Sequence, residues 1–300
     1  MPLNTREFTV FAPAKVNLHL AVKDKRADGF HNIESVFIAV DFGDFLHFQI
    51  GTGEWNEACI LEADVSNVNS GIIPMKENII YKAVSVFRGE TGFSQKIKIK
   101  LEKNIPIGGG LGGGSSDAAA VLLALNETAG FPCSLKDLLK MGEALGSDVP
   151  FFIHQTSAAI VTGRGEIIKA IKIPQMYLVI VNPGFQSNSS CAYKLLDEYR
   201  KSKNIINESE SMNVDFINHF DIINKSSFLN SFLPVFDEPE KSIYIDIISQ
   251  LNAAGAEFAG LSGSGSTCFG IFSDWETAQK VSDLLLKKCS FVKAVKTFRS

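Results

Sequence analysis

The sequence predicts an α+β fold with two sub-domains. Two segments, Lys15–Val22 and Lys96–Leu101, alternate strictly in side-chain character, which is typical of strands with one buried face. A glycine-rich segment runs directly into the apolar run Ala118–Leu125, which predicts a loop followed by a buried helix. Strands and helices are mixed without a sustained βαβ rhythm, so an α+β architecture is favoured.

Composition excludes several classes of protein. The chain has 300 residues, of which 45% are hydrophobic and 21% charged, as in an ordinary globular protein. Its 29 basic and 33 acidic residues give a formal charge of −4, so no global positive field attracts nucleic acid or an anionic membrane. The longest strictly apolar run has eight residues, far below the roughly 20 of a membrane-spanning helix.

The first residues and the cysteines bear on location. No basic and apolar leader precedes the strand-like stretch at Phe8, so we expect a cytoplasmic protein. The five cysteines are widely spaced and odd in number, which indicates neither a disulfide framework nor a zinc ribbon.

The N-terminal region predicts several strands. In the first, Lys15, Asn17 and His19 share the face opposite the buried valines and leucines. A turn follows at 26–29, and the β-branched and aromatic stretch 33–50 predicts one or two strands with breaks near Asp41 and Gly43. The three lysines of Lys96–Leu101 are most simply a solvated strand face.

Two helices follow the glycine-rich segment. For the first, Ser115 or Ser116 is the expected N-cap, Asp117 suits the positive end, and Gly130 is the expected left-handed C-cap. Ser134 is expected to cap the second helix, which ends at Gly146. Its buried face is expected to hold four leucines, Leu135, Leu138, Leu139 and Leu145.

The second half of the chain is also mixed. A core strand at 176–181 ends at Asn182-Pro183-Gly184, and a helix is expected from Ser189 or Ser190. The stretch 202–231 is rich in asparagine and serine and predicts loosely packed helices with loops. A glycine-rich turn at 260–267 then precedes an expected strand (268–272), a helix (275–288) and a last strand (291–298).

The glycine-rich segment predicts a phosphate site. Six of the seven positions 108–114 are glycine, and glycine contributes no side chain to packing. Successive backbone N–H groups before a helix N-terminus form a concave anion site, so we expect phosphate there. A flexible linker is the alternative. The Walker pattern is absent because no lysine follows the glycines, and the dinucleotide fingerprint lacks its preceding buried strand.

Phosphoryl transfer also needs a carboxylate and a cation. Asp148 is the candidate carboxylate because it lies in a short turn before an apolar run, although it could instead cap a helix that begins at Pro150. Lys15 is the candidate cation because it shares a strand face with Asn17 and His19. A solvated strand lysine is the alternative.

Together these segments resemble the GHMP kinase superfamily. Five blocks occur in the family's order and span nearly the whole chain. They are Pro13–Leu18 (P-A-K-x-N-L), Arg26–His31 (R-x-D-G-[YF]-H), Ile105–Ser116 (I-P-x-G-G-G-L-G-G-G-S-S), Leu145–Phe151 (L-G-[AS]-D-V-P-[FV]) and Leu261–Thr267 (M-S-G-S-G-x-[ST]). The resemblance implies two lobes with the active site in the cleft: residues 1–160, like domain 2 of ribosomal protein S5, and an α/β lobe, residues 161–300.

The resemblance also implies roles for individual residues. Asp148 would be the general base and Lys15 the charge stabiliser, with ATP as phosphoryl donor and Mg²⁺ bound mainly through ATP. The implied ATP-binding residues are Asn78, Lys103, Pro106, Gly108, Gly109, Gly110, Leu111, Gly112, Gly113, Gly114, Ser115 and Ser116. The implied substrate-binding residues are Asn17, Phe30, His31, Ser189, Tyr193, Gly263, Ser264 and Gly265. No residue is implied as a protein metal ligand.

The Arg26–His31 block and the doubled triple glycine resemble one branch of the family, which phosphorylates an alcohol linked to cytidine diphosphate. The resemblance implies that Phe30 and His31 hold a cytosine, with Tyr193 as a second stacking ring. Phe30 departs from the more usual tyrosine, and Ser189 from threonine.

The alternatives are a homoserine or mevalonate type of kinase and a non-catalytic nucleotide-binding protein. We expect a small-molecule substrate, no nucleic acid or membrane partner, and a monomer or weak homodimer.

Overall fold

The computed structural model describes residues 5–51, 58–66, 77–203, 205, 228–287 and 289–299. The chain forms two compact units. Unit 1 comprises residues 1–14, 42–107 and 112–155, and unit 2 comprises residues 15–41, 108–111 and 156–300. The units interleave along the sequence because two long strands, β1 (Arg6–Lys25) and β2 (His31–Gly51), contribute residues to both. A lobe boundary near residue 160 stays a prediction.

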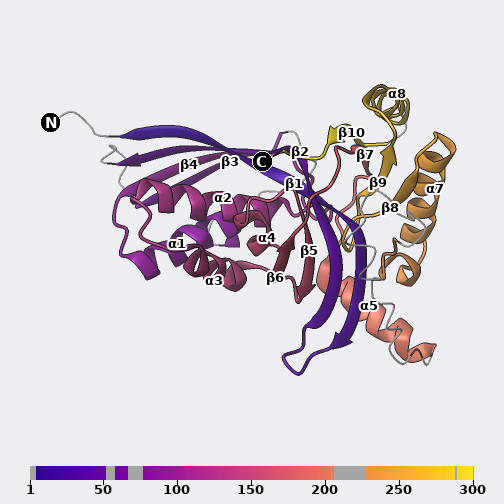
Figure 1. Ribbon diagram of the computed structural model, residues 1–300, viewed down its shortest axis with the longest axis horizontal. Helices are drawn as coiled ribbons and strands as arrows, with labels where there is room; N and C mark the ends of the chain where they lie inside the picture. The colour runs from indigo at the N-terminus through magenta and orange to yellow at the C-terminus, as the bar shows by residue number, and fades with distance from the viewer. Residues whose placement is uncertain are drawn as a thin grey trace. The chain divides into compact units, whose positions relative to one another are not determined.

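Unit 1 is a sheet with helices packed on one side (Figure 1). Strand β4 (Lys96–Glu102) pairs antiparallel with β2 and parallel with β3 (Cys59–Asp64). The helices are α1 (Ile79–Thr91), α2 (Gly113–Thr128), α3 (Leu135–Leu145) and α4 (Val149–Ile153). Helix α2 packs against the other three helices, and its apolar run is buried on nearly every side, as its sequence predicts.

Unit 2 contains part of a six-stranded sheet, whose strands β1 and β2 also contribute to unit 1, and a second sheet of four strands. In the first, β2 pairs with β1 and with β5 (Ala158–Gly163), which pairs with β6 (Ile167–Ala170). The second is antiparallel in the order β10-β7-β9-β8. Its strands are β7 (Tyr177–Asn182), β8 (Phe258–Leu261), β9 (Cys268–Phe272) and β10 (Phe291–Lys296).

In the described part of unit 2, three helices and a short 3-10 turn accompany the sheets. Helix α7 (Glu240–Ala253) packs on β8 and β9, and α8 (Trp275–Leu285) packs on β7 and β10 (Figure 1). Helix α5 (Ser189–Ser202) packs against the 3-10 turn Leu233–Val235. None of the helices in the described ranges is long and apolar enough to cross a membrane.

The expected strands and helices outside the stretch 202–231 are found, and three of their details differ. Strand β2 is continuous, so the expected breaks near Asp41 and Gly43 are wrong. A Cβ at Gly43 would overlap the Ala12 carbonyl, so this glycine permits close approach of β1. Helix α8 ends at Leu285 and β10 at Lys296, before the expected ends.

The two expected helix starts have different outcomes. Ser134 caps α3, as predicted, and it also forms a capping box with Asp137. The capping of α2 by Ser115 or Ser116 is wrong, because α2 begins at Gly113, before either serine. Its N-cap is Gly112, whose φ of +70° suits glycine.

The buried face of α3 also differs from the expected row of leucines. Leu138 and Met141 are buried, whereas Leu135 is 51% exposed. The packing centres on Gly142, where a Cβ would lie 2.6 Å from the Ile153 side chain of α4. Gly130 does adopt the predicted left-handed φ, +81°, after α2. Most of the Asn/Ser-rich stretch, residues 204 and 206–227, lies outside the described residues.

Candidate functional site

The glycine-rich segment of unit 2 is fixed through its carbonyl groups. All four carbonyls of Gly108–Leu111 accept hydrogen bonds from other parts of unit 2. The donors are Ser187 N to Gly108 at 2.9 Å, Thr267 N to Gly109 at 3.1 Å, Ser262 Oγ to Gly110 at 3.0 Å, and Lys15 N to Leu111 at 2.9 Å. The loop is therefore a rigid element of the structure and not a linker.

The backbone N–H groups of the same segment, unlike its carbonyls, are not bonded to other parts of the described chain. Within the described part of the chain, the N–H groups of Gly108–Leu111 have no hydrogen-bond acceptor. In unit 1, Gly112 and the first turn of α2 follow, where backbone N–H groups have no partner within the helix. The unused N–H donors of the loop favour binding of an anion such as phosphate, and the positive end of a helix does so independently.

Gly110 is required by the chain itself. Its φ is +73°, and a Cβ there would overlap the Ser262 carbonyl oxygen and lie 2.8 Å from that of Gly265. Gly114 differs because it lies in α2 and its nearest neighbour would be the Ile79 side chain at 3.5 Å. A substitution at Gly110 therefore tests the packing of the loop, whereas a substitution at Gly114 tests the binding of a ligand.

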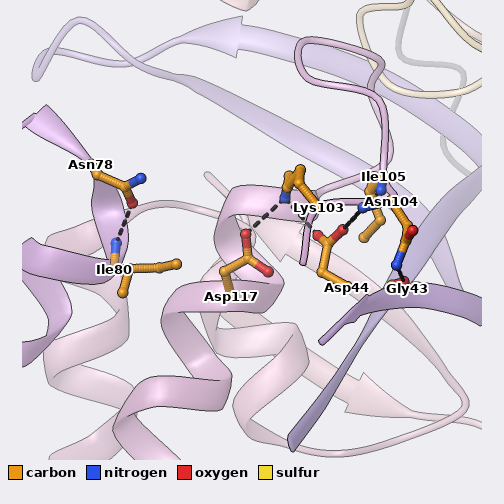
Figure 2. A network of polar contacts seen from close by, with 8 residues as sticks. All are labelled: Gly43, Asp44, Asn78, Ile80, Lys103, Asn104, Ile105 and Asp117. Carbon is orange, nitrogen blue, oxygen red and sulfur yellow. Dashed lines mark hydrogen bonds and ion pairs between the residues drawn. The ribbon is translucent and has the colours of Figure 1, made fainter. Parts of the chain in front are cut away.

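A buried ion cluster lies in unit 1, as Figure 2 shows. Lys103 Nζ lies 2.5 Å from Asp44 Oδ2 and 2.7 Å from Asp117 Oδ2. The other oxygen of Asp44 accepts hydrogen bonds from the backbone N–H groups of Asn104 (2.6 Å) and Ile105 (2.8 Å). The cluster thus joins the chain that enters the loop to helix α2, which leaves it.

Burial dominates the electrostatics of this cluster. It raises the pKa of Asp117 to about 7, although the neighbouring lysine acts in the opposite direction. Burial also acts to lower the pKa of Lys103, but the two carboxylates outweigh it and the pKa lies above the ordinary value. Lys103 therefore stays charged as the counter-ion of two carboxylates. Ser116 Oγ and Asp117 Oδ1 are buried without a hydrogen-bond partner in the described structure.

Asn78, the other residue expected near the adenine, caps helix α1 in unit 1. Its Oδ1 accepts a hydrogen bond of 2.9 Å from Ile80 N (Figure 2). A contact of Asn78 or Lys103 with a nucleotide stays a prediction.

Lys15 is held in unit 2 by its neighbours on strands β1 and β2. Its Nζ donates to Asn17 Oδ1 at 2.5 Å and lies 4.7 Å from the centre of the Phe37 ring. Asn17 in turn donates through its side-chain amide to Ser35 Oγ at 3.0 Å, and its backbone N–H donates to Ser262 Oγ at 3.2 Å. Lys15 is buried, so the solvated strand lysine considered above is wrong.

Asp148 lies in unit 1 at the N-cap position of the short helix α4. Its side chain makes no capping hydrogen bond to that helix. The structural alternative, that Asp148 serves as a side-chain cap for a helix at Pro150, is therefore not supported. Its half-buried position beside a buried Val149-Pro150-Phe151 run restricts water access on one side.

The residues expected to hold a cytosine lie in unit 2. His31 is buried, stacks on Tyr193 with ring centres 5.0 Å apart, and lies 2.8 Å from Asp197. Phe30 is 48% exposed, and the Arg164 guanidinium lies 5.1 Å from its ring centre. Tyr193 also makes an edge contact with Phe232, with ring centres 4.9 Å apart.

The C-terminal glycine turn brings the remaining expected residues together. Ser189 Oγ lies 2.8 Å from Ser264 Oγ, and Ser187 Oγ donates to the Ser264 carbonyl at 2.6 Å. Asn230 donates to the Gly263 carbonyl at 2.8 Å. A Cβ at Gly265 would lie 2.8 Å from the Tyr244 hydroxyl, so this turn is tightly packed.

The sequence prediction missed three residues that organise these groups. Asp44 and Asn230 have no local signal, because their partners lie far along the chain. Asp197 does have a local signal, because it follows Tyr193 by four residues and therefore lies on the same face of α5. Among the described residues, no cluster of three histidine, cysteine, aspartate or glutamate side chains could hold a metal ion.

Family models match both halves of the chain. The model of the GHMP kinases N terminal domain matches residues 78–156, and the model of the GHMP kinases C terminal region matches residues 216–290.

Relatives of similar length match almost the whole chain. A 4-diphosphocytidyl-2-C-methyl-D-erythritol kinase of Thermodesulfovibrio yellowstonii is 37% identical, with 91% of this chain and 92% of the relative covered. The protein of the same name from Geobacter metallireducens is 34% identical, with 97% and 99% covered.

Solved structures agree with the fold. A crystal structure of 4-(cytidine 5'-diphospho)-2C-methyl-D-erythritol kinase has a TM-score of 0.78 and 26% identity, with 98% of this chain and 100% of that chain covered. A homoserine kinase from Cytophaga hutchinsonii has a TM-score of 0.66 at 17% identity, with 97% and 94% covered, and supports the fold alone.

The glycine-rich loop gives the first testable prediction. Gly114→Ala should fold normally and bind ATP about tenfold more weakly, because its Cβ would hold phosphate oxygens away from the N–H groups and so weaken a hydrogen bond to a charged group. Gly110→Ala should lower the stability itself by at least about 1 kcal/mol, because its φ is left-handed. Calorimetric titration with a non-hydrolysable ATP analogue and thermal unfolding check both variants. Unchanged ATP binding by Gly114→Ala would remove α2's first turn from the phosphate site.

The ion cluster gives the second prediction. Lys103→Met leaves two buried carboxylates without their counter-ion and should lower the free energy of unfolding by about 3–5 kcal/mol. Adding Asp117→Asn should recover part of this loss, because one of the like charges is removed. Lys98→Met, which removes a partly exposed pair with Glu62, is the control and should cost about 0–1 kcal/mol. Equal losses for Lys103→Met and Lys98→Met in urea unfolding would contradict the account.

Proposed function

The chain belongs to the GHMP kinases and, within them, to the family of 4-diphosphocytidyl-2-C-methyl-D-erythritol kinases, and from this premise we propose the reaction that it catalyses. It transfers the γ-phosphoryl group of ATP to the 2-hydroxyl of 4-diphosphocytidyl-2-C-methyl-D-erythritol. This is a step of the non-mevalonate, or methylerythritol phosphate, route to isoprenoid precursors. The identity of the relatives over nearly the whole chain is the observation that carries the proposal.

The phosphate groups of ATP bind the backbone of the glycine-rich loop in this proposal. The supporting observation is the division of the loop into carbonyls that are bonded to the protein and N–H groups that have no acceptor in the described chain. Such fixed donors stabilise the charge that develops on phosphate oxygens without reorganisation. Mg²⁺ accompanies ATP and is held mainly by its phosphate oxygens.

Asp148 and Lys15 carry the chemistry in this proposal. Asp148 accepts the proton of the attacking hydroxyl, and its side chain is not engaged in capping α4. Lys15 stabilises negative charge on the transferring group, and its ammonium is oriented by Asn17 and Phe37. Their roles rest on the family resemblance of the two sequence blocks that contain them.

The substrate is held through its cytosine. Phe30 offers an exposed ring for stacking, and His31 lies beside it at the start of β2. Asn17, Ser189 and the turn Gly263–Gly265 complete the proposed substrate contacts. The cytoplasmic location and the monomeric or weakly dimeric state stay predictions.

The experiment that tests the proposal is a coupled assay of ATP consumption with three alcohols in parallel. We expect turnover with 4-diphosphocytidyl-2-C-methyl-D-erythritol and essentially none with homoserine or mevalonate. Comparable turnover of either of those alcohols would favour another kinase of the family. Binding of ATP without turnover of any alcohol would favour a non-catalytic nucleotide-binding protein.

Asp148→Asn should fold normally, bind both substrates and lose turnover by a factor of about 10² to 10⁴, the usual contribution of a general base. The exposed Asp283→Asn makes the same chemical change on α8 and should retain full activity. Lys15→Ala should also lose turnover, and the double variant should lose far less than the product of the two effects, because both residues act on one step. Near-normal turnover of Asp148→Asn would remove it from the mechanism.

Phe30→Ala should raise the KM for the cytidylyl substrate roughly 5- to 150-fold, which corresponds to about 1 to 3 kcal/mol for one stacking face. The KM for ATP should stay the same, since adenine is expected elsewhere, near Asn78. Phe131→Ala, at another exposed phenylalanine, is the matched control. An unchanged KM for the cytidylyl substrate would exclude Phe30 from the pocket.

A further inference from the structure

His31 is seated in unit 2 by two side chains of one helix. Its Nε2 lies 2.8 Å from Asp197 Oδ1, and its ring stacks on Tyr193 with an angle of 19° between the ring planes. Tyr193 and Asp197 are four residues apart on α5 and therefore lie on the same helix face. The helix thus contacts the imidazole both on its ring face and at one of its two nitrogens.

Asp197 has a second partner that fixes its other oxygen. Lys25 Nζ lies 2.7 Å from Asp197 Oδ2, so the carboxylate connects the two strands on either side of the turn at 26–29. Burial acts to raise the pKa of Asp197, but the hydrogen bonds from Lys25 and His31 outweigh it, and the pKa lies below its ordinary value. Asp197 is therefore ionised near neutral pH.

An ionised carboxylate accepts hydrogen bonds and cannot donate one. Nε2 of His31 must then carry the proton that it shares with Asp197, and in a neutral imidazole the other nitrogen, Nδ1, keeps its lone pair. The stacked Tyr193 ring restricts rotation of the imidazole. The geometry therefore fixes both the direction of the ring and which nitrogen is an acceptor.

We propose that Asp197 is a positioning residue that sets the tautomer of His31 and thereby favours cytosine over uracil in the substrate. This inference rests on the proposed function. Cytosine carries an amino group, a donor, at the position where uracil carries a carbonyl oxygen, an acceptor. An Nδ1 lone pair accepts a hydrogen bond from the amino group of cytosine and repels the carbonyl oxygen of uracil. The tautomer of His31 therefore determines which of the two bases is favoured.

The test uses Asp197→Asn with Glu198→Gln as the matched control. Both variants replace a carboxylate by its amide at neighbouring positions of α5, but Glu198 is exposed. We expect Asp197→Asn to raise the KM for the cytidylyl substrate at least about tenfold, as the loss of an outer-shell partner of histidine does at metal sites. The turnover number and the KM for ATP should change little. The preference for the cytidylyl substrate over its uridylyl counterpart should fall by a similar factor.

A second measurement is independent of activity and of the variant's folding. In the wild-type protein, the nitrogen chemical shifts of His31 should show a protonated Nε2 and an unprotonated Nδ1. A proton on Nδ1, alone or in addition, would overturn the inference. So would an unchanged KM and an unchanged base preference in Asp197→Asn. Absence of wild-type turnover would instead overturn the proposed function, and the choice of base with it.

Discussion

The fixed backbone of the glycine-rich segment is the constraint on which the rest of the site depends. The carbonyls of Gly108–Leu111 are bonded to three parts of unit 2: Ser187, the middle of β1 and the C-terminal glycine turn. Because the carbonyls are used in this way, the N–H groups are the polar atoms left for a ligand. Gly110 is necessary for this arrangement, since any side chain there would meet the backbone of the turn.

The buried cluster of Lys103, Asp44 and Asp117 has a related role in unit 1. Asp44 orients the residues that precede the loop, and Asp117 belongs to the helix that follows it. Burying three charged groups costs free energy, so a well-packed apolar set would be at least as stable. The cluster instead fixes the positions of the three side chains, because Lys103 must contact both carboxylates at once. Within unit 1 it connects the segment 103–105 with the first turns of α2.

Local sequence patterns predicted most of the helices and strands. They failed where contacts with distant parts of the chain determine the structure. Alternation located β1 and β4, and Ser134 located the start of α3, because these signals depend on neighbouring residues alone. The start of α2 was missed because a left-handed glycine replaced the usual side-chain cap. Asp44 was missed because its partners are 59 or more residues away. The glycine loop was found as a phosphate site, but the packing of Gly110 on the chain itself could only be seen in the structure.

The central claim, that the N–H groups of this loop hold the triphosphate, is tested most directly by nuclear magnetic resonance of protein labelled with ¹⁵N-glycine. On titration with a non-hydrolysable ATP analogue, the amide signals of the loop glycines, Gly108 to Gly114, should shift together. Those of Gly92 and Gly255, at the ends of α1 and α7, should stay in place. Saturation by the analogue with unshifted loop signals would contradict the account and move the phosphate site elsewhere in the chain.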